Sequence, residues 1–86
     1  MAITLEVVTP TGVQMCEEGL ERVVVRRRED RYELGSEVAI YPHHGPLLMQ
    51  TQDCRVRLTR DGLTREADVA AGVLEVLDDR VTIIVT

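Results

Sequence analysis

The sequence of 86 residues contains no lysine, phenylalanine or tryptophan and only two tyrosines. Proteins that bind single-stranded nucleic acid stack bases on aromatic rings and neutralise phosphates with cationic side chains. Ten arginines stand against 15 aspartates and glutamates, which gives a formal net charge of -5 near neutral pH. The scarcity of aromatics and the acidic balance together argue against a nucleic-acid partner.

Long apolar runs are missing as well. No stretch approaches the roughly 18 consecutive apolar residues of a membrane span, and residues 1–12 lack the basic start and long apolar run of a signal peptide. We therefore expect a soluble, cytosolic protein without direct membrane insertion. At this length roughly 60% of the surface of the unfolded chain can be buried, which suffices for one domain over residues 1–86 but not for a large catalytic cleft.

Cysteine is scarce: Cys16 and Cys54 lie 38 positions apart and fit no close pair of metal ligands. Cytosolic thiols stay reduced, and a free cysteine behaves as a small apolar residue. We therefore expect both cysteines to be reduced and to lie in the core.

Valine supplies 13 of the 86 residues, and β-branched side chains favour strands. Turn-forming residues recur about every ten positions, and apolar residues alternate with polar ones between them, a pattern typical of short strands in a sandwich or barrel. The strand over residues 73–77 is apolar on both faces except for Glu75, so we place it inside a sheet. The pattern predicts an all-β fold with strands over residues 3–8, 13–18, 54–59, 63–69, 73–77 and 80–85, turns at Asp61-Gly62 and Asp78-Asp79, and a core that includes Val23, Val56, Val76, Val81 and Ile83.

Residues 17–35 are compatible with two structures. A helix would place four apolar residues roughly on one stripe, namely Leu20, Val23, Val24 and Leu34. Gly19 would then lie in its first turn. Three consecutive valines lose side-chain freedom in a helix and fit a strand well. We favour a strand from Leu20 to about Arg26, followed by a charged loop.

The segment Pro42-His43-His44-Gly45-Pro46 allows three interpretations. Histidine is a common metal ligand, yet adjacent residues of an extended segment point to opposite sides, so a metal site would need a tight turn and further ligands such as Cys54. Two prolines and Gly45 also fit a rigid structural loop. Thirdly, a rigid loop with amphipathic side chains loses little entropy on binding, which suits a docking surface.

The run Arg26-Arg27-Arg28-Glu29-Asp30-Arg31 suggests contact with phosphate or with an acidic partner. Glu29 and Asp30 offset half of its charge, so a solvated loop is the simpler interpretation. No hydroxyl lies near a His-acid set at recognisable spacing, and there is no glycine-rich phosphate loop. The sequence therefore predicts a protein without catalytic or metal-binding residues and without a cofactor.

Four segments taken together resemble one family. Residues 5–12, 42–48, 71–76 and 80–84 are similar, in order, to the signatures of the ε subunit of F-type ATP synthase. The first matches an opening LxIVTPxG, the second a loop GILPGHAPLL, and the last two an ending SGGFLEVxxNxVTVL. His44 matches the family's histidine, whereas His43 stands at a family glycine.

The resemblance implies the N-terminal β-sandwich domain of ε, with about ten short strands in two five-stranded sheets. It implies a non-catalytic central-stalk, or rotor, subunit that links the γ subunit to the c ring and contacts other F1 subunits indirectly. The protein would couple ion translocation to ATP synthesis or hydrolysis as a peripheral part of the F1 sector, on the cytoplasmic face of the bacterial inner membrane. In this interpretation the residues that contact partners are Arg26, Arg27, Arg28, Arg31, Pro42, His43, His44, Gly45, Pro46 and Leu47.

The family usually continues into a C-terminal helical hairpin, which this sequence lacks. A chain that stops one residue after a strand is expected to be complete as a folding unit. The segment before Pro42 is longer and more charged than the family's Gly-rich connection. The alternative function is a small metal- or ligand-binding β domain that uses the loop of His43 and His44 and perhaps Cys54.

Overall fold

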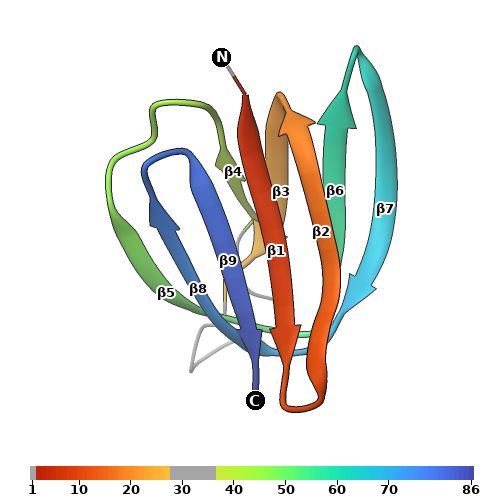
Figure 1. Cartoon of the computed structure of the whole chain (residues 1–86), viewed down its shortest axis with the longest axis vertical. Coiled ribbons are helices and arrows are strands. Elements are labelled where there is room, and N and C mark those ends of the chain that lie inside the picture. Colours follow the sequence, from red (N-terminus) through yellow and green to blue (C-terminus); the bar gives the residue numbers. More distant parts are fainter. Residues whose placement is uncertain (1, 28–36) are drawn as a thin grey trace.

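A computed structural model describes residues 2–27 and 37–86, and these residues form two packed β-sheets (Figure 1). The predicted all-β sandwich is confirmed. None of the described residues belongs to a helix long and apolar enough to cross a membrane. The strands of the described residues are β1 (Ile3–Thr9), β2 (Gly12–Leu20), β3 (Arg22–Arg26), β4 (Glu37–Ile40), β5 (Leu47–Thr51), β6 (Cys54–Arg60), β7 (Leu63–Val69), β8 (Gly72–Leu77) and β9 (Arg80–Val85).

Sheet A has the strand order β2-β1-β9-β8-β5, and sheet B has the order β4-β3-β6-β7. The resemblance implied two five-stranded sheets, whereas sheet B has four strands within the described residues. All pairings are antiparallel except that of β1 with β9, which is parallel. The C-terminal strand β9 therefore lies between the N-terminal strand β1 and strand β8, in the middle of sheet A.

The two predicted two-residue turns are confirmed by their backbone conformation. Asp61 and Gly62 have φ angles of 53° and 75°, and Asp78 and Asp79 have 50° and 61°. Positive φ at both central residues is the signature of a type I′ turn, whose twist matches that of the strands it joins. Gly62 adopts this conformation without the steric cost that a side chain adds.

Alternation along the strands produces the core between the sheets. Leu5 and Val7 of β1, like Val81 and Ile83 of β9, point inward and are at most 1% exposed. The five valine and isoleucine residues predicted for the core are all buried. The buried apolar set comprises Ile3, Leu5, Val7, Leu20, Val23, Val24, Val25, Ile40, Val56, Leu58, Val69, Leu74, Val76, Val81 and Ile83.

Close strand approach explains one glycine. A Cβ atom on Gly72 would overlap the carbonyl oxygen of Ile84 on the neighbouring strand β9. Only glycine therefore allows the start of β8 to pair with the end of β9 at this separation.

Two sequence predictions need correction. The strand expected from Leu20 to Arg26 starts instead at Arg22, because Leu20 continues β2 and pairs with Ile3. Valines 23–25 do form a strand, and the helix alternative is wrong for these residues. Cys16 was expected in the core, but it is exposed, because the alternation of β2 places it opposite Glu6 on the outer face. Cys54 is half-buried and packs against the core, and both thiols are free.

Candidate functional site

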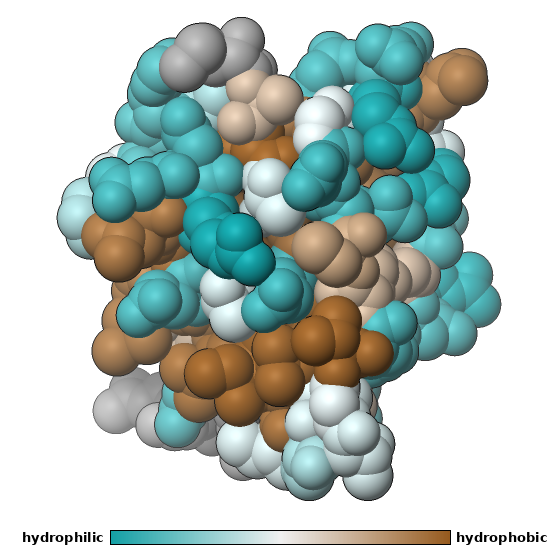
Figure 2. All heavy atoms as spheres, viewed as in Figure 1, coloured by the Kyte–Doolittle hydropathy of each residue, from teal (hydrophilic) through white to brown (hydrophobic). Residues whose placement is uncertain are grey.

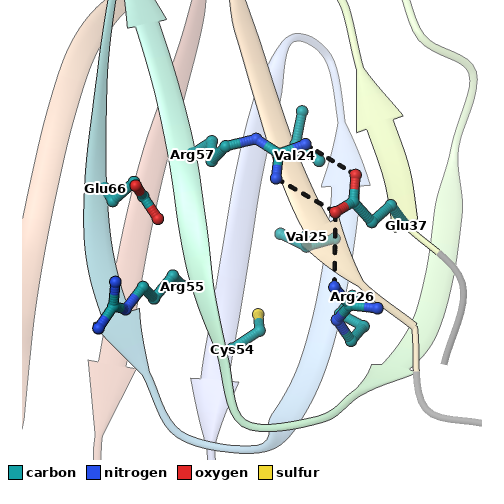
Figure 3. Close-up of a pocket in the computed structure, with 8 residues that line it drawn as sticks. All are labelled: Val24, Val25, Arg26, Glu37, Cys54, Arg55, Arg57 and Glu66. Carbon is teal, nitrogen blue, oxygen red and sulfur yellow. Dashed lines mark hydrogen bonds and ion pairs between the residues drawn. The ribbon is translucent and has the colours of Figure 1, made fainter. Parts of the chain in front are cut away.

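The outer face of sheet B carries a hollow of about 280 Å³ lined largely by charged side chains (Figure 3). Arg57 extends across Val24 toward Glu37, and its two terminal nitrogens donate to the two carboxylate oxygens at 3.1 and 2.7 Å. Arg26 reaches the same carboxylate at 3.5 Å. The charges of this hollow thus largely satisfy one another.

Hydrogen bonding shifts the acidity of this pair. The bond from Arg57 holds the pKa of Glu37 below its ordinary value of 4.5, and the carboxylate in turn raises the pKa of Arg57. Because both groups are exposed to solvent, we read the pair as a tie between β4 and β6 rather than as a reactive centre.

The connection from β4 to β5 passes from sheet B to sheet A at the upper end of the sandwich in Figure 1. There it contacts the turn between β8 and β9. The backbone N–H of His43 donates to the Asp79 carboxylate at 2.6 Å, and the imidazole Nδ1 lies 4.0 Å from the other oxygen. His43 has a φ of 65°. A tight left-handed bend, held by the turn between β8 and β9, therefore defines this loop.

Those predicted contact residues that the structure describes fall at two opposite ends of the sandwich. Arg26 ends β3 and Arg27 follows it at the lower end in Figure 1, where Arg27 forms an isolated bridge with Thr51. Residues 42–47 lie at the upper end. Arg28 and Arg31 lie outside the described residues. Within residues 2–27 and 37–86, the structure thus does not gather the predicted contact residues into one surface.

The structure also separates the residues of the alternative metal site. Cys54 starts β6 at the lower end, far along the sandwich from the histidine loop (Figure 1). His44 Nδ1 lies 2.7 Å from the carbonyl oxygen of Gly45. Within residues 2–27 and 37–86, no three His, Cys, Asp or Glu side chains are placed to share a metal ion.

A surface that the sequence analysis did not single out lies on the outer face of sheet A. Neighbouring strands place four aliphatic side chains in one row, because Val13 is opposite Val8, Val8 opposite Ile84, and Ile84 opposite Val73. Val13 and Ile84 are 61% and 50% exposed. Figure 2 shows this hydrophobic area over the lower halves of β8, β9, β1 and β2. We call Val8, Val13, Val73 and Ile84 the apolar row.

The sequence did contain a signal for this row. Apart from Glu75, residues 73–77 are apolar on both faces of the strand, and Ile84 stands at an outward position of β9. Such residues exceed what one core face needs, which indicates a second buried or docking face. Their alignment across four strands, however, depends on sheet order, and strand pattern alone does not provide it.

Fold and surface together define a small two-layer β-sandwich with an apolar outer sheet face. The sequence profile described as "ATP synthase, Delta/Epsilon chain, beta-sandwich domain" matches residues 2–86. The chain belongs to this family, as its resemblance to ε subunits indicated.

Curated relatives agree with this assignment. The ATP synthase epsilon chain of Herpetosiphon aurantiacus is 34% identical over 84 residues, which cover 98% of this chain and 57% of that protein. The epsilon chain of Caldicellulosiruptor bescii is 31% identical over 80 residues, covering 93% and 53%, and that of Bacillus licheniformis is 33% identical over 82 residues, covering 95% and 57%. The chain thus spans a little over half the length of these relatives.

Proposed function

We propose that this chain is the β-sandwich domain of an ε subunit in a rotary F-type ATP synthase. The observation that carries the proposal is the match of residues 2–86 to the family's sandwich domain. In this role the chain performs no bond-making step. It joins the γ subunit to the c ring within the central stalk and so couples ion translocation to ATP synthesis or hydrolysis.

The architecture supports such a mechanical role. A joint between two rotating parts must resist shear, and a close-packed interior deforms little under load. Each sheet contributes aliphatic side chains to one continuous core. Cross-strand ties such as Arg57–Glu37 add to the rigidity of sheet B without filling a ligand site.

The surfaces suggest how two partners are accommodated. An exposed apolar row is costly in water and favours burial against another protein, so we assign it to the γ contact together with the loop of residues 42–47. Arg26 and Arg27 lie at the end of the sandwich opposite to this loop and are assigned to the c ring, where guanidinium groups suit acidic side chains. Arg28 and Arg31, which belong to the same charged run of the sequence, are part of the same proposal.

The same proposal sets the location of the protein. As a stalk component it is peripheral, bound on the cytoplasmic face of the bacterial inner membrane through other subunits. Contacts with the remaining F1 subunits are then indirect, through γ.

The apolar row provides the experimental test. Ile84→Arg places a charge in its centre, and we expect affinity for the γ subunit encoded in the same genome to fall more than tenfold, because a desolvated charge opposes an apolar interface. Isothermal titration calorimetry or co-purification measures this loss. The thermal midpoint should change little, because Ile84 is half exposed.

The matched control is Leu63→Arg, which adds the same charge at a 74% exposed leucine on β7 of sheet B. We expect it to bind γ like the unmodified chain. If the unmodified chain does not bind γ, the proposed function is wrong. If both variants lose affinity equally, the assignment of the γ contact to sheet A is wrong.

A further inference from the structure

Beside the apolar row, the outer face of sheet A contains a hollow that combines leucine side chains with one carboxylate. Its volume is about 290 Å³, and it is lined by Pro46, Leu47, Leu48, Glu75, Val76 and Leu77. Leu48 and Leu77 are 70% and 49% exposed. The hollow lies where edge strand β5 pairs with β8, next to the loop of residues 42–47.

Glu75 is the polar group of this hollow. It stands directly opposite Leu48 on β5 and opposite Thr82 on β9, and Leu77 follows it two positions later on the same face. Its side chain makes no hydrogen bond or ion pair with another described residue. Arg80 lies opposite Leu77, but its guanidinium donates to Glu6 at 3.0 Å. The hollow therefore presents a carboxylate, unpaired within the described residues, among aliphatic side chains.

An occupant must satisfy both parts of this surface. Burial of a carboxylate without a partner is costly, so a purely apolar side chain would be a poor fit. A compact cation would pair with Glu75 but leave the leucines exposed. Arginine has an aliphatic stem that packs on apolar surface and a planar head that donates two parallel hydrogen bonds to a carboxylate.

The charge of the surrounding sheet agrees with a basic partner. The strands of sheet A carry Glu6, Glu18 and Glu75 against one cation, Arg80, whereas Glu17 pairs with arginines of sheet B. Those of sheet B have the opposite balance, with Arg22, Arg26, Arg55, Arg57, Arg60 and Arg65 against Glu37, Glu66 and Asp68. A basic side chain is thus attracted to sheet A rather than to sheet B.

We propose that this hollow receives an arginine of the partner that docks on sheet A, with Glu75 as its carboxylate and Leu48 and Leu77 as the packing surface for its stem. This inference rests on the proposed function, because it takes the partner to be γ. It specifies the chemistry of one contact between sheet A and γ. In this contact Glu75 determines specificity for a basic side chain of the partner.

Titration of the full chain with γ tests the contact. We expect Glu75→Gln, which keeps the shape and removes the charge, to weaken binding roughly tenfold, because a charge-assisted pair is lost and the partner's cation remains unpaired. Glu75→Lys should weaken it further through repulsion. In addition, the affinity of the unmodified chain should fall more steeply with salt than that of Glu75→Gln.

Two variants serve as controls. Glu66→Gln makes the same change at an exposed position of β7 on sheet B, and we expect unchanged affinity. Leu77→Ser removes packing surface and keeps the carboxylate, and we expect a loss of affinity with an unchanged salt dependence. Thermal midpoints close to that of the unmodified chain would show that all variants fold.

The outcomes separate the two proposals. If the unmodified chain binds γ and Glu75→Gln binds equally well, the arginine contact is wrong and the proposed function stands. Equal losses in Glu75→Gln and Glu66→Gln would also overturn it, because the effect would then follow net charge alone. If the unmodified chain does not bind γ at all, the proposed function is wrong, and this inference fails with it.

Discussion

His43 illustrates how a single residue stores strain in the loop between β4 and β5. Its φ of 65° lies in the left-handed region, which side chains other than glycine occupy at a cost. The hydrogen bond from its backbone N–H to Asp79 holds this conformation. Glycine stands at this position in the ε family that the sequence resembles, and glycine reaches the same conformation freely.

We therefore predict that His43→Gly stabilises the fold by about 1 kcal/mol, because the backbone strain disappears while the bond to Asp79 is kept. Such a change raises the thermal midpoint of a domain of this size by about 4–8 °C. His43→Ala is the control, since alanine keeps the strain and should bring no gain. A midpoint that does not rise in His43→Gly would contradict the strain argument.

Residue identity alone predicted the backbone conformation of two turns, but it did not predict the conformation of His43 or the exposure of Cys16. Asp61-Gly62 and Asp78-Asp79 were recognised as turns because short polar residues and glycine tolerate positive φ. The conformation of His43 was not predicted, because the carboxylate that holds the bend comes from a turn 36 positions later. Likewise, the exposure of Cys16 follows from the register of β2 with β1.

At the scale of elements, ion pairs join the edges of the two sheets. Glu17 on edge strand β2 of sheet A forms an ion pair with Arg65 of β7 at 2.6 Å and lies 3.9 Å from Arg60 of β6. The neighbouring backbone carbonyl of Glu18 accepts a bond from Arg60 at 3.0 Å. These contacts join β2 of sheet A to β6 and β7 of sheet B along one side of the sandwich. The strands joined in this way belong to different sheets and are not paired with one another.

The pair with Arg65 gives a pH-dependent contribution to stability. The hydrogen bond from Arg65 lowers the pKa of Glu17 below its ordinary value of 4.5. A carboxyl whose pKa is lower in the folded state stabilises the fold above the unfolded pKa, and this contribution is lost as pH falls through the folded pKa. We predict that Glu17→Gln lowers the free energy of unfolding by about 0.5–1 kcal/mol at pH 7, a modest value because Arg65 is more than half exposed.

Urea denaturation between pH 7 and pH 3 measures this contribution. The difference between Glu17→Gln and the unmodified chain should shrink as the pH falls below about 4.5, because both side chains are then neutral. Glu18→Gln, at the next and exposed position of β2, should show no such difference at any pH. A constant difference for Glu17→Gln over the whole range would contradict an electrostatic origin.

Strand β9 determines the integrity of the whole molecule. It pairs with β1 on one side and with β8 on the other, so it connects the first hairpin of the chain to the rest of sheet A. Its inward residues Val81 and Ile83 are at most 1% exposed and fill the centre of the core. The two ends of the sequence must therefore meet before sheet A is continuous.

We predict that a chain ending at Leu77 does not fold, because removal of β9 detaches the β1–β2 hairpin from the rest of sheet A and opens the core. Far-ultraviolet circular dichroism should show no cooperative thermal transition. A chain that lacks only Thr86, whose backbone N–H lies 3.5 Å from the carbonyl oxygen of Ala71, should unfold like the unmodified chain. A cooperative transition in the shorter chain would show that sheet A holds together without its central strand.

The sequence by itself determined the class of fold, most of the strands and the family. Alternation with a period of two decides which side chains a strand can bury, so Val56, Val76 and Ile83 were recognisable as core residues without any partner strand. The candidate contact residues in the charged run and the histidine loop were also visible as composition and turn chemistry.

Tertiary structure alone decided how these pieces combine. The parallel pairing of β1 with β9 aligns Val8 with Ile84 and creates the apolar row, while the pairing of β5 with β8 brings Leu48 beside Glu75. It also sends Arg26 and His43 to opposite ends of the sandwich. Strand periodicity specifies the face on which a residue lies, but its neighbours across the sheet depend on strand order and register, which arise from contacts between distant parts of the chain.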